Sequence, residues 1–289
     1  MSAFSVRAYT PAIGAEIAGL DLSRPLDDAT FAALRQAWHR HLVLVFPGQR
    51  LSDQELERFS ARFGDLDRKP LYTEEVVDTT TSDYVCVISN VKVDGKPIGD
   101  LGDGEAVWHT DMSYNPLPPM AAALYALEIP GSGGETGFAN MYLAYETMPA
   151  ALKARIRGLS CKHDATHNSA GGLRRGMKEV DDLSTSPGTA HPMVRTHPET
   201  SRDALYLGRR RHAYIMGLPV AESERLLDDV WAHAERPEFA WHHTWRLGDL
   251  VLWDNRCVMH RRNSFDPAAR RVMHRTQVKG DQPYLRSAA

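Results

Sequence analysis

Hydrophobic residues recur at helical spacing in several segments of the chain. Between residues 26 and 39 the apolar positions Phe31, Leu34 and Trp38 lie three or four residues apart, which predicts an amphipathic helix. A short β-branched-rich run, 42–46, follows and predicts a strand that ends at Pro47-Gly48. Two later segments, 150–157 and 221–234, also carry an apolar face at this spacing and predict further helices.

A second early helix is indicated by its start signal. Ser52 and Glu55 fit a capping box, in which the serine and glutamate side chains satisfy each other's free backbone amides. Leu56, Phe59 and Phe63 follow at helical spacing, so a helix is expected from residue 52 to about residue 64.

The remaining hydrophobic runs are short and rich in residues that favour strands. They are separated by Gly, Pro and Asp turns, which is typical of a sandwich or jelly roll with helices packed outside. The expected strands are 84–88, 121–127, 159–163, 193–196, 204–207, 241–245, 250–253 and 271–278. The pattern therefore predicts a mainly β fold with flanking helices, and without a linker or internal repeat we expect one domain over residues 1–289.

Composition narrows the class of protein. A chain of 289 residues with 43% hydrophobic residues can bury a large core, and its net charge of −3 favours neither nucleic acid nor an anionic membrane as a partner. No apolar run is long enough to span a bilayer, so we expect a cytoplasmic enzyme. We also expect the chain to form a homo-oligomer. Cys86, Cys161 and Cys257 are odd in number and widely spaced, and we interpret them as reduced core residues.

Two segments carry candidate metal ligands. In Trp108-His109-Thr110-Asp111 the imidazole and the carboxylate are two positions apart, so on extended backbone both can reach one ion. A His-x-Asp pair alone is weak evidence, since a surface histidine beside a turn aspartate is the commoner case. His260, near the end of a strand-loop segment, could supply a third ligand. Two imidazoles and one carboxylate on one face leave positions open for a chelating co-substrate and O₂, which suits Fe(II).

Taken together, these motifs resemble the taurine and dichlorophenoxyacetate dioxygenase family of 2-oxoglutarate enzymes from about residue 12 to residue 284. The motifs that carry the resemblance are Trp108-His109-Thr110-Asp111, Gly133-Gly134-Glu135-Thr136 with Phe138 and Met141, the block 191–198, and the block 253–275. The resemblance implies a distorted double-stranded β-helix, or jelly roll, with Fe(II) held by His109, Asp111 and His260.

The resemblance also implies where the co-substrate binds. Arg271 would pair with the distal carboxylate of 2-oxoglutarate, and Thr136 would donate a hydrogen bond to the same group. Other readings stay open from the residues alone. Thr136 could be a turn residue after two glycines. Arg271 could instead form a surface ion pair with Asp266 or Asp281.

Arg275 resembles the family arginine that binds the anionic head of the primary substrate. Alternate strand positions share a face, so Arg271 and Arg275 can point the same way, although Arg275 could also be a surface cation. Other candidate substrate contacts depart from the taurine enzymes. They are Lys69 and Tyr72, where those enzymes have a histidine before Pro-Val-Tyr, Met112 beside the metal motif, and Arg211 and His212 in the basic run that begins at Arg209.

The expected activity is hydroxylation of a small organic acid, a sulfonate or an aryloxy or alkyl carboxylate, with O₂ and with decarboxylation of 2-oxoglutarate to succinate. Desaturation, or oxidation of an amino-acid- or lipid-derived acid, would use the same iron. A non-catalytic metal-binding sensor is the rival from another class. All of the expected metal and co-substrate residues are present, which argues against a protein that has lost its catalytic activity. The other histidines have no partner at ligand spacing, so no second metal site is expected.

Overall fold

The protein is described by a computed structural model, which covers residues 4–69, 76–101, 106–174 and 176–287. Its helices are α1 (Asp28–His41), α2 (Asp53–Ala61), α3 (Met141–Glu146), α4 (Ala150–Ile156) and α5 (Val220–Ala234), with short 3₁₀ turns η1 (Leu183–Thr185) and η2 (Pro237–Phe239). The predicted capping box is confirmed, because Ser52 Oγ accepts a hydrogen bond from the Glu55 amide and the Glu55 carboxylate accepts one from the Ser52 amide.

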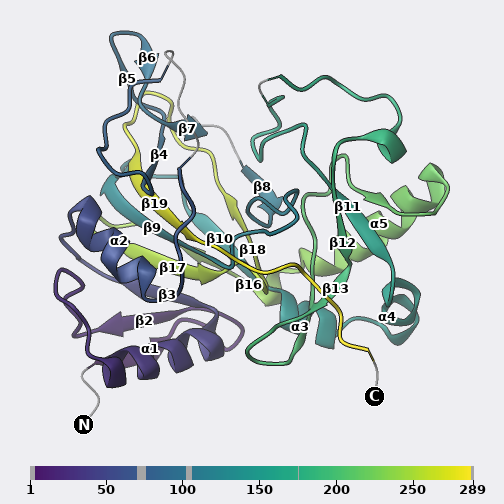
Figure 1. Cartoon of the computed structure of the whole chain (residues 1–289), viewed down its shortest axis with the longest axis horizontal. Coiled ribbons are helices and arrows are strands. Elements are labelled where there is room, and N and C mark those ends of the chain that lie inside the picture. Colours follow the sequence, from purple (N-terminus) through teal and green to yellow (C-terminus); the bar gives the residue numbers. More distant parts are fainter. Residues whose placement is uncertain (1–3, 70–75, 102–105, 175, 288–289) are drawn as a thin grey trace.

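Most of the strand residues lie in two principal sheets (Figure 1). The large sheet has the order β1 (Ser5–Ala8), β2 (Ala15–Ala18), β3 (Val43–Phe46), β17 (Leu250–Asp254), β9 (Ala121–Glu128), β19 (Val272–Val278), β4 (Cys86–Ser89) and β7 (Asp100–Leu101). The small sheet has the order β16 (Ala240–His243), β10 (Thr136–Asn140), β18 (Val258–Arg262) and β8 (Ala106–His109).

The other strands lie in smaller units. A third sheet has the order β12 (Gly188–Pro192), β11 (Ser160–Asp164) and β15 (Tyr214–Ile215). Two ribbons pair β13 (Val194–Thr196) with β14 (Asp203–Leu205), and β5 (Lys92–Val93) with β6 (Lys96–Pro97). The strands expected from hydrophobic runs are therefore confirmed to within two residues at each end.

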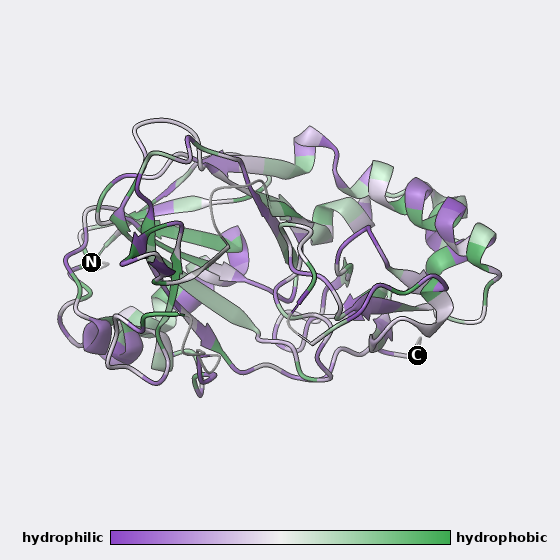
Figure 2. Ribbon diagram, turned by 90° about the horizontal axis from the view of Figure 1, so that it is seen from above, coloured by the Kyte–Doolittle hydropathy of each residue, from purple (hydrophilic) through white to green (hydrophobic). Residues whose placement is uncertain are grey.

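The large sheet is covered on both faces, and side-chain alternation decides which residues face which layer. On β17, Leu250 and Leu252 pack with α1 and α2, whereas Val251 and Trp253 face the core shared with the small sheet. The Phe138 and Trp253 rings, 5.6 Å apart, join the two sheets across that core. Figure 2 shows the hydrophobic strands inside the molecule and helices with one polar and one apolar side.

The cysteines, the lengths of the helices and two further strands can be compared with what the sequence predicts. Cys86, Cys161 and Cys257 are buried and form no disulfide, as predicted. Within the described part of the chain, no helix is both long enough and apolar enough to span a bilayer. β10 and β18 were not expected as strands, because glycine and the charged run His260-Arg261-Arg262 interrupt their apolar pattern.

Candidate metal and co-substrate site

Strand pairing brings the two candidate histidine ligands side by side. β8 and β18 are antiparallel neighbours in the small sheet, and His109 lies directly opposite His260 in their register. Because directly opposed residues point to the same face of a sheet, the two rings meet, with centroids 4.1 Å apart. His260 also packs against the Trp253 ring, 4.8 Å away, which fixes it toward the core between the sheets.

Asp111 completes the cluster from the segment that follows β8. One carboxylate oxygen of Asp111 lies 3.6 Å from His109 Nε2 and 3.9 Å from His260 Nε2. All three side chains are buried, and one donor atom from each lies within 4.8 Å of the others. Two imidazoles and one carboxylate at these separations can ligate a single ion with little side-chain movement.

The protonation states also suit a metal. His109 Nδ1 lies 2.7 Å from the Val107 carbonyl, so the opposite ring nitrogen, Nε2, is the one that faces Asp111. Burial, and then the neighbouring His109, lowers the pKa of His260 to about 3. His260 is therefore neutral at physiological pH, which is the form that binds metals.

The Asp111 carboxylate is held in its charged form by its neighbours. Burial alone would raise the pKa of Asp111. Arg275 and the two histidines lower it by more than burial raises it, so the net shift is downward. Arg275 Nη1 lies 3.3 Å and 3.4 Å from the two carboxylate oxygens, and Gln277 Nε2 lies 3.5 Å from one of them. Arg275 and Gln277 share a face of β19, and the intervening Thr276 bonds Ser60 of α2 on the other face.

The backbone of Asp111 is fixed by a residue to which sequence reasoning gave no role. The Asn255 side-chain amide accepts a hydrogen bond from the Asp111 amide (2.9 Å) and donates one to the Asp111 carbonyl (3.0 Å) and another to the Pro119 carbonyl (2.8 Å). Asn255 follows β17 directly, so the large sheet positions the loop that carries the third ligand. Only its place in the block 253–275 could have marked it beforehand.

A narrow cavity, which we call the inner cavity, adjoins His109 and His260. Its described lining also includes Thr136, Arg262, Arg271 and Arg275, with Ile88, Leu124 and Trp253 among its apolar members. Thr136 lies on β10 and is 3% exposed, and its hydroxyl accepts a hydrogen bond from Trp245 Nε1 at 2.9 Å. The structure thus places Thr136 in a strand rather than in a turn.

Arg271 is buried in this cavity, and among the described residues it has no ion-pair partner. It is 2% exposed, and within the described chain its Nε has no hydrogen-bond partner. Burial, and then the positive charge of Arg262, lowers the pKa of Arg271 to about 9. A buried guanidinium without a counter-charge is costly, so the inner cavity fits an anionic ligand such as the distal carboxylate of 2-oxoglutarate.

A second cavity, the outer cavity, opens on the other side of the cluster and has a volume of about 400 Å³. It shares His109 and Arg275 with the inner cavity and adds Asp111, Met112 and Gln277. Met112 therefore lies where a substrate contact was expected, with a left-handed backbone conformation (φ 47°) directly after the ligand Asp111.

Three other candidate substrate residues lie elsewhere, and Tyr72 lies outside the described residues. Lys69 is not among the described residues that line either cavity, and its Nζ pairs with Asp78 at 2.6 Å. Arg211 and His212 line a separate pocket beside α5, while Arg209, two residues earlier, lines the outer cavity. His212 has a left-handed backbone conformation (φ 62°).

Two further histidine clusters differ from the expectation that the other histidines lack partners. His197, Asp254 and Cys257 are buried together, and His167, Glu179 and His212 form the other group. The Asp254 carboxylate is bonded by His197 and Arg256, so its charge is already compensated within the protein. The two ring nitrogens of His167 already lie 3.2 Å from the Asp164 and Glu179 carboxylates, and the His212 ring stacks on the His167 ring.

A mainly β fold with two buried imidazoles and one carboxylate has the ligand set of the non-haem iron enzymes. Comparison with known proteins agrees with this class. Residues 5–277 match the model of the family described as taurine catabolism dioxygenase TauD, TfdA family. The chain belongs to this family, and it is an Fe(II)- and 2-oxoglutarate-dependent dioxygenase.

Relatives match along nearly the whole chain. A (S)-phenoxypropionate/alpha-ketoglutarate-dioxygenase of Sphingobium herbicidovorans is 36% identical over 293 residues, covering 96% of each chain. An alpha-ketoglutarate-dependent 2,4-dichlorophenoxyacetate dioxygenase of a Burkholderia species is 32% identical, covering 93% of this chain and 92% of the relative. The crystal structure of AAD-2 in complex with Mn(II) and N-oxalylglycine is similar with a TM-score of 0.79 and 32% identity, covering 97% and 98%.

Proposed function

We propose that His109, Asp111 and His260 hold Fe(II), and that Arg271 and Thr136 bind the distal carboxylate of 2-oxoglutarate. The observation that carries this proposal is the adjacency of the buried cluster to a cavity that contains the Arg271 guanidinium. The two principal sheets are, in this proposal, the halves of a distorted jelly roll, and the chain is a single domain.

The chemistry follows from the two cavities. When bound, iron and 2-oxoglutarate supply the oxidation: one O₂ converts the keto acid to succinate and CO₂ and adds one oxygen atom to a substrate C–H bond. The two imidazoles and the Asp111 carboxylate would hold the ion. Asn255 fixes the backbone that carries Asp111, and Arg271 orients the co-substrate. Substrate in the outer cavity excludes water from the cluster.

Arg275 is proposed to receive the anionic group of a small acid substrate. It lines both cavities, and its guanidinium already lies beside the Asp111 carboxylate. The activity of the relatives on phenoxypropionate and dichlorophenoxyacetate supports an acid as substrate. The contact with Asp111 adds a consequence that sequence reasoning did not contain, because removal of Arg275 changes the charge balance at a metal ligand.

The test is succinate formation with iron, ascorbate and 2-oxoglutarate across a panel of aryloxy and alkyl carboxylates, sulfonates and sulfate esters. We expect acids to stimulate succinate formation and their neutral amides to fail. Arg275→Lys is expected to retain part of the stimulation, since lysine keeps the charge but loses the planar two-bond fork. Equal turnover of acids and amides would show that Arg275 does not select an anion.

A further inference from the structure

Five polar residues of the outer cavity come from segments that supply no member of the metal cluster. These residues, which we call the distal wall, are His163, Asp164, Asn168, Arg174 and Arg209. They belong to β11, the segment that follows it and the segment that follows β14. In Figure 1, β11 and β19 lie on opposite sides of β8. β11 carries His163 and Asp164, and β19 carries Arg275.

Arg209 brings a largely buried positive charge to this wall. One of its terminal nitrogens donates to the Asp164 carbonyl at 2.7 Å and lies 3.7 Å from the Asp164 carboxylate. That carboxylate also accepts hydrogen bonds from the amides of Thr166 and His167 and from the Thr166 hydroxyl. Asp164 is therefore largely satisfied by its own loop, and Arg209 keeps donor capacity toward the cavity.

Arg174 and Asn168 add further donors. Arg174 donates from Nε to the His167 carbonyl (2.9 Å) and from Nη1 to the Tyr114 hydroxyl (2.7 Å), so its orientation is fixed. The Asn168 side-chain oxygen accepts two backbone hydrogen bonds, which leaves its NH₂ group as the part available to a ligand. Burial, and then the positive charge of Arg174, lowers the pKa of Arg209, although Asp164 acts in the opposite direction.

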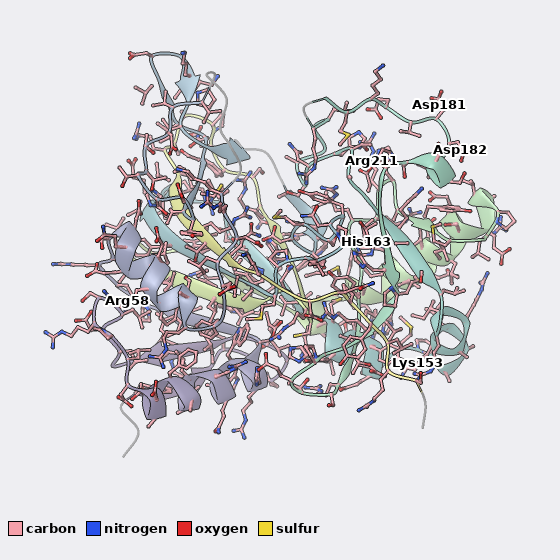
Figure 3. All side chains as sticks on the ribbon, in the orientation of Figure 1. Arg58, Lys153, His163, Asp181, Asp182 and Arg211 are labelled. Carbon is pink, nitrogen blue, oxygen red and sulfur yellow. The ribbon has the colours of Figure 1, made fainter. Side chains whose placement is uncertain are left out.

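His163 supplies a neutral polar group to the same wall. It is 1% exposed, and burial lowers the pKa of its imidazole well below the usual value, although the Ser113 backbone acts in the opposite direction. Within the described chain, neither ring nitrogen makes a well-formed hydrogen bond. Figure 3 shows His163 inside the molecule, whereas Arg211 lies nearer its upper edge.

The lining contrasts with what an unsubstituted aromatic ring would need. Among the described residues that line the outer cavity, the wholly apolar side chains are those of Cys86, Ile88, Met112 and Leu173. Sites for apolar ligands are lined mainly by hydrophobic and aromatic side chains, with few polar groups. An apolar ring against Arg174 and Arg209 would cover their remaining donor groups without offering them an acceptor.

We propose that the substrate of this enzyme is a dianion with anionic groups at both ends. One group binds at Arg275, as the proposed function already requires. The second, a carboxylate, sulfonate or phosphate oxygen group, binds between Arg209 and Arg174 with the Asn168 amide as an additional donor. The inference rests on the proposed function for its first anchor and names the substrate class that the distal wall selects.

The test compares 4-carboxyphenoxyacetate with 4-methylphenoxyacetate, two ligands of similar shape that differ in the second charge. With iron and saturating 2-oxoglutarate, we expect wild type to prefer the diacid in kcat/KM for succinate formation by about tenfold or more, as one charge-assisted pair implies. Arg209→Gln and Arg174→Gln should each reduce this preference, measured as the ratio of kcat/KM for the two acids. Arg211→Gln is the matched comparison, and it should keep the wild-type preference.

Equilibrium binding of the same two acids, followed by isothermal titration in the presence of Mn(II) and 2-oxoglutarate, separates recognition from turnover. Tighter binding of the diacid in wild type but not in Arg209→Gln supports the dianion even if neither compound is oxidised. A monoacid that binds and reacts as well as the diacid overturns the dianion proposal and leaves the proposed function standing. Loss of all acid-stimulated succinate formation with intact diacid binding would instead contradict the proposed function.

Discussion

The inner and outer cavities meet at the same metal cluster but are built differently. The inner cavity takes His109, Thr136, His260 and Arg262 from paired strands of the small sheet. The outer cavity takes much of its lining from segments between strands, such as the loop after β11. Strand pairing fixes side chains to the accuracy that chemistry needs, whereas loops can vary without disturbing the scaffold. The strands thus hold His109, His260 and Thr136 in place, whereas the loops supply Arg174 and Arg209, the residues by which the outer cavity can differ between relatives.

The largest effect is expected from the cluster itself. His109→Ala or Asp111→Ala should reduce iron-dependent succinate formation to background and weaken Fe(II) binding, because two remaining protein ligands cannot hold the ion in this geometry. Fe(II) titration and succinate assays measure both effects. His242→Ala, at an exposed histidine on the nearby strand β16, should retain wild-type activity. Near-normal turnover in the His109 and Asp111 variants would show that the cluster does not take part in the reaction.

The next effect tests the inner cavity as an anion site. Arg271→Ala should raise the 2-oxoglutarate concentration needed for half-maximal activity about tenfold or more, since a charge-assisted pair worth roughly 1.5–3 kcal/mol is lost. Arg270→Ala is the matched control, because Arg270 is exposed and pairs with Glu128 at 2.6 Å. If both variants show the same 2-oxoglutarate dependence, Arg271 does not bind the co-substrate.

A smaller effect is expected when the hydrogen bonds from Asn255 to the Asp111 backbone are changed. Asn255→Asp keeps the shape of the side chain but replaces the NH₂ group that donates to the Asp111 and Pro119 carbonyls. Loss of such supporting groups typically weakens metal binding by about 10- to 100-fold. Fe(II) affinity should therefore fall while circular dichroism keeps the wild-type spectrum. An unchanged Fe(II) affinity would mean that the end of β8 positions Asp111 without help from the Asn255 side-chain amide.

The smallest effect concerns a residue outside both cavities. Lys69→Met should leave kcat/KM for any active acid within about twofold and change the free energy of unfolding by less than about 1 kcal/mol, as for other partly exposed ion pairs. The partner, Asp78, is itself partly exposed. Substrate kinetics and urea unfolding measure the two quantities. A loss of substrate affinity of tenfold or more would show that Lys69 contacts the substrate, as the sequence suggested.

The difference between the cavities also explains what could be predicted from the sequence. The hydrophobic pattern predicted the scaffold, and the family motifs named the residues that the structure gathers around the cluster and the inner cavity. Asn255 was missed, because its role depends on a contact between β17 and a loop far away in sequence. Arg211 and His212 were expected to contact substrate because the family resemblance places the basic run near the active site. The structure instead puts Arg209 in the outer cavity and the other two in a separate pocket, since a resemblance locates a loop without fixing which of its side chains point inward.

The register between β8 and β18 has a consequence for folding. His109 and His260 lie about half the chain apart in sequence, yet they oppose each other directly in the small sheet. Contacts of such long sequence separation form slowly, because the intervening chain must first be ordered. A nascent chain that has not yet released residue 260 therefore has only one of its two imidazoles, and high-affinity iron uptake should appear only after the C-terminal strands have joined the sheets. Iron binding would then report completed folding as well as readiness for catalysis.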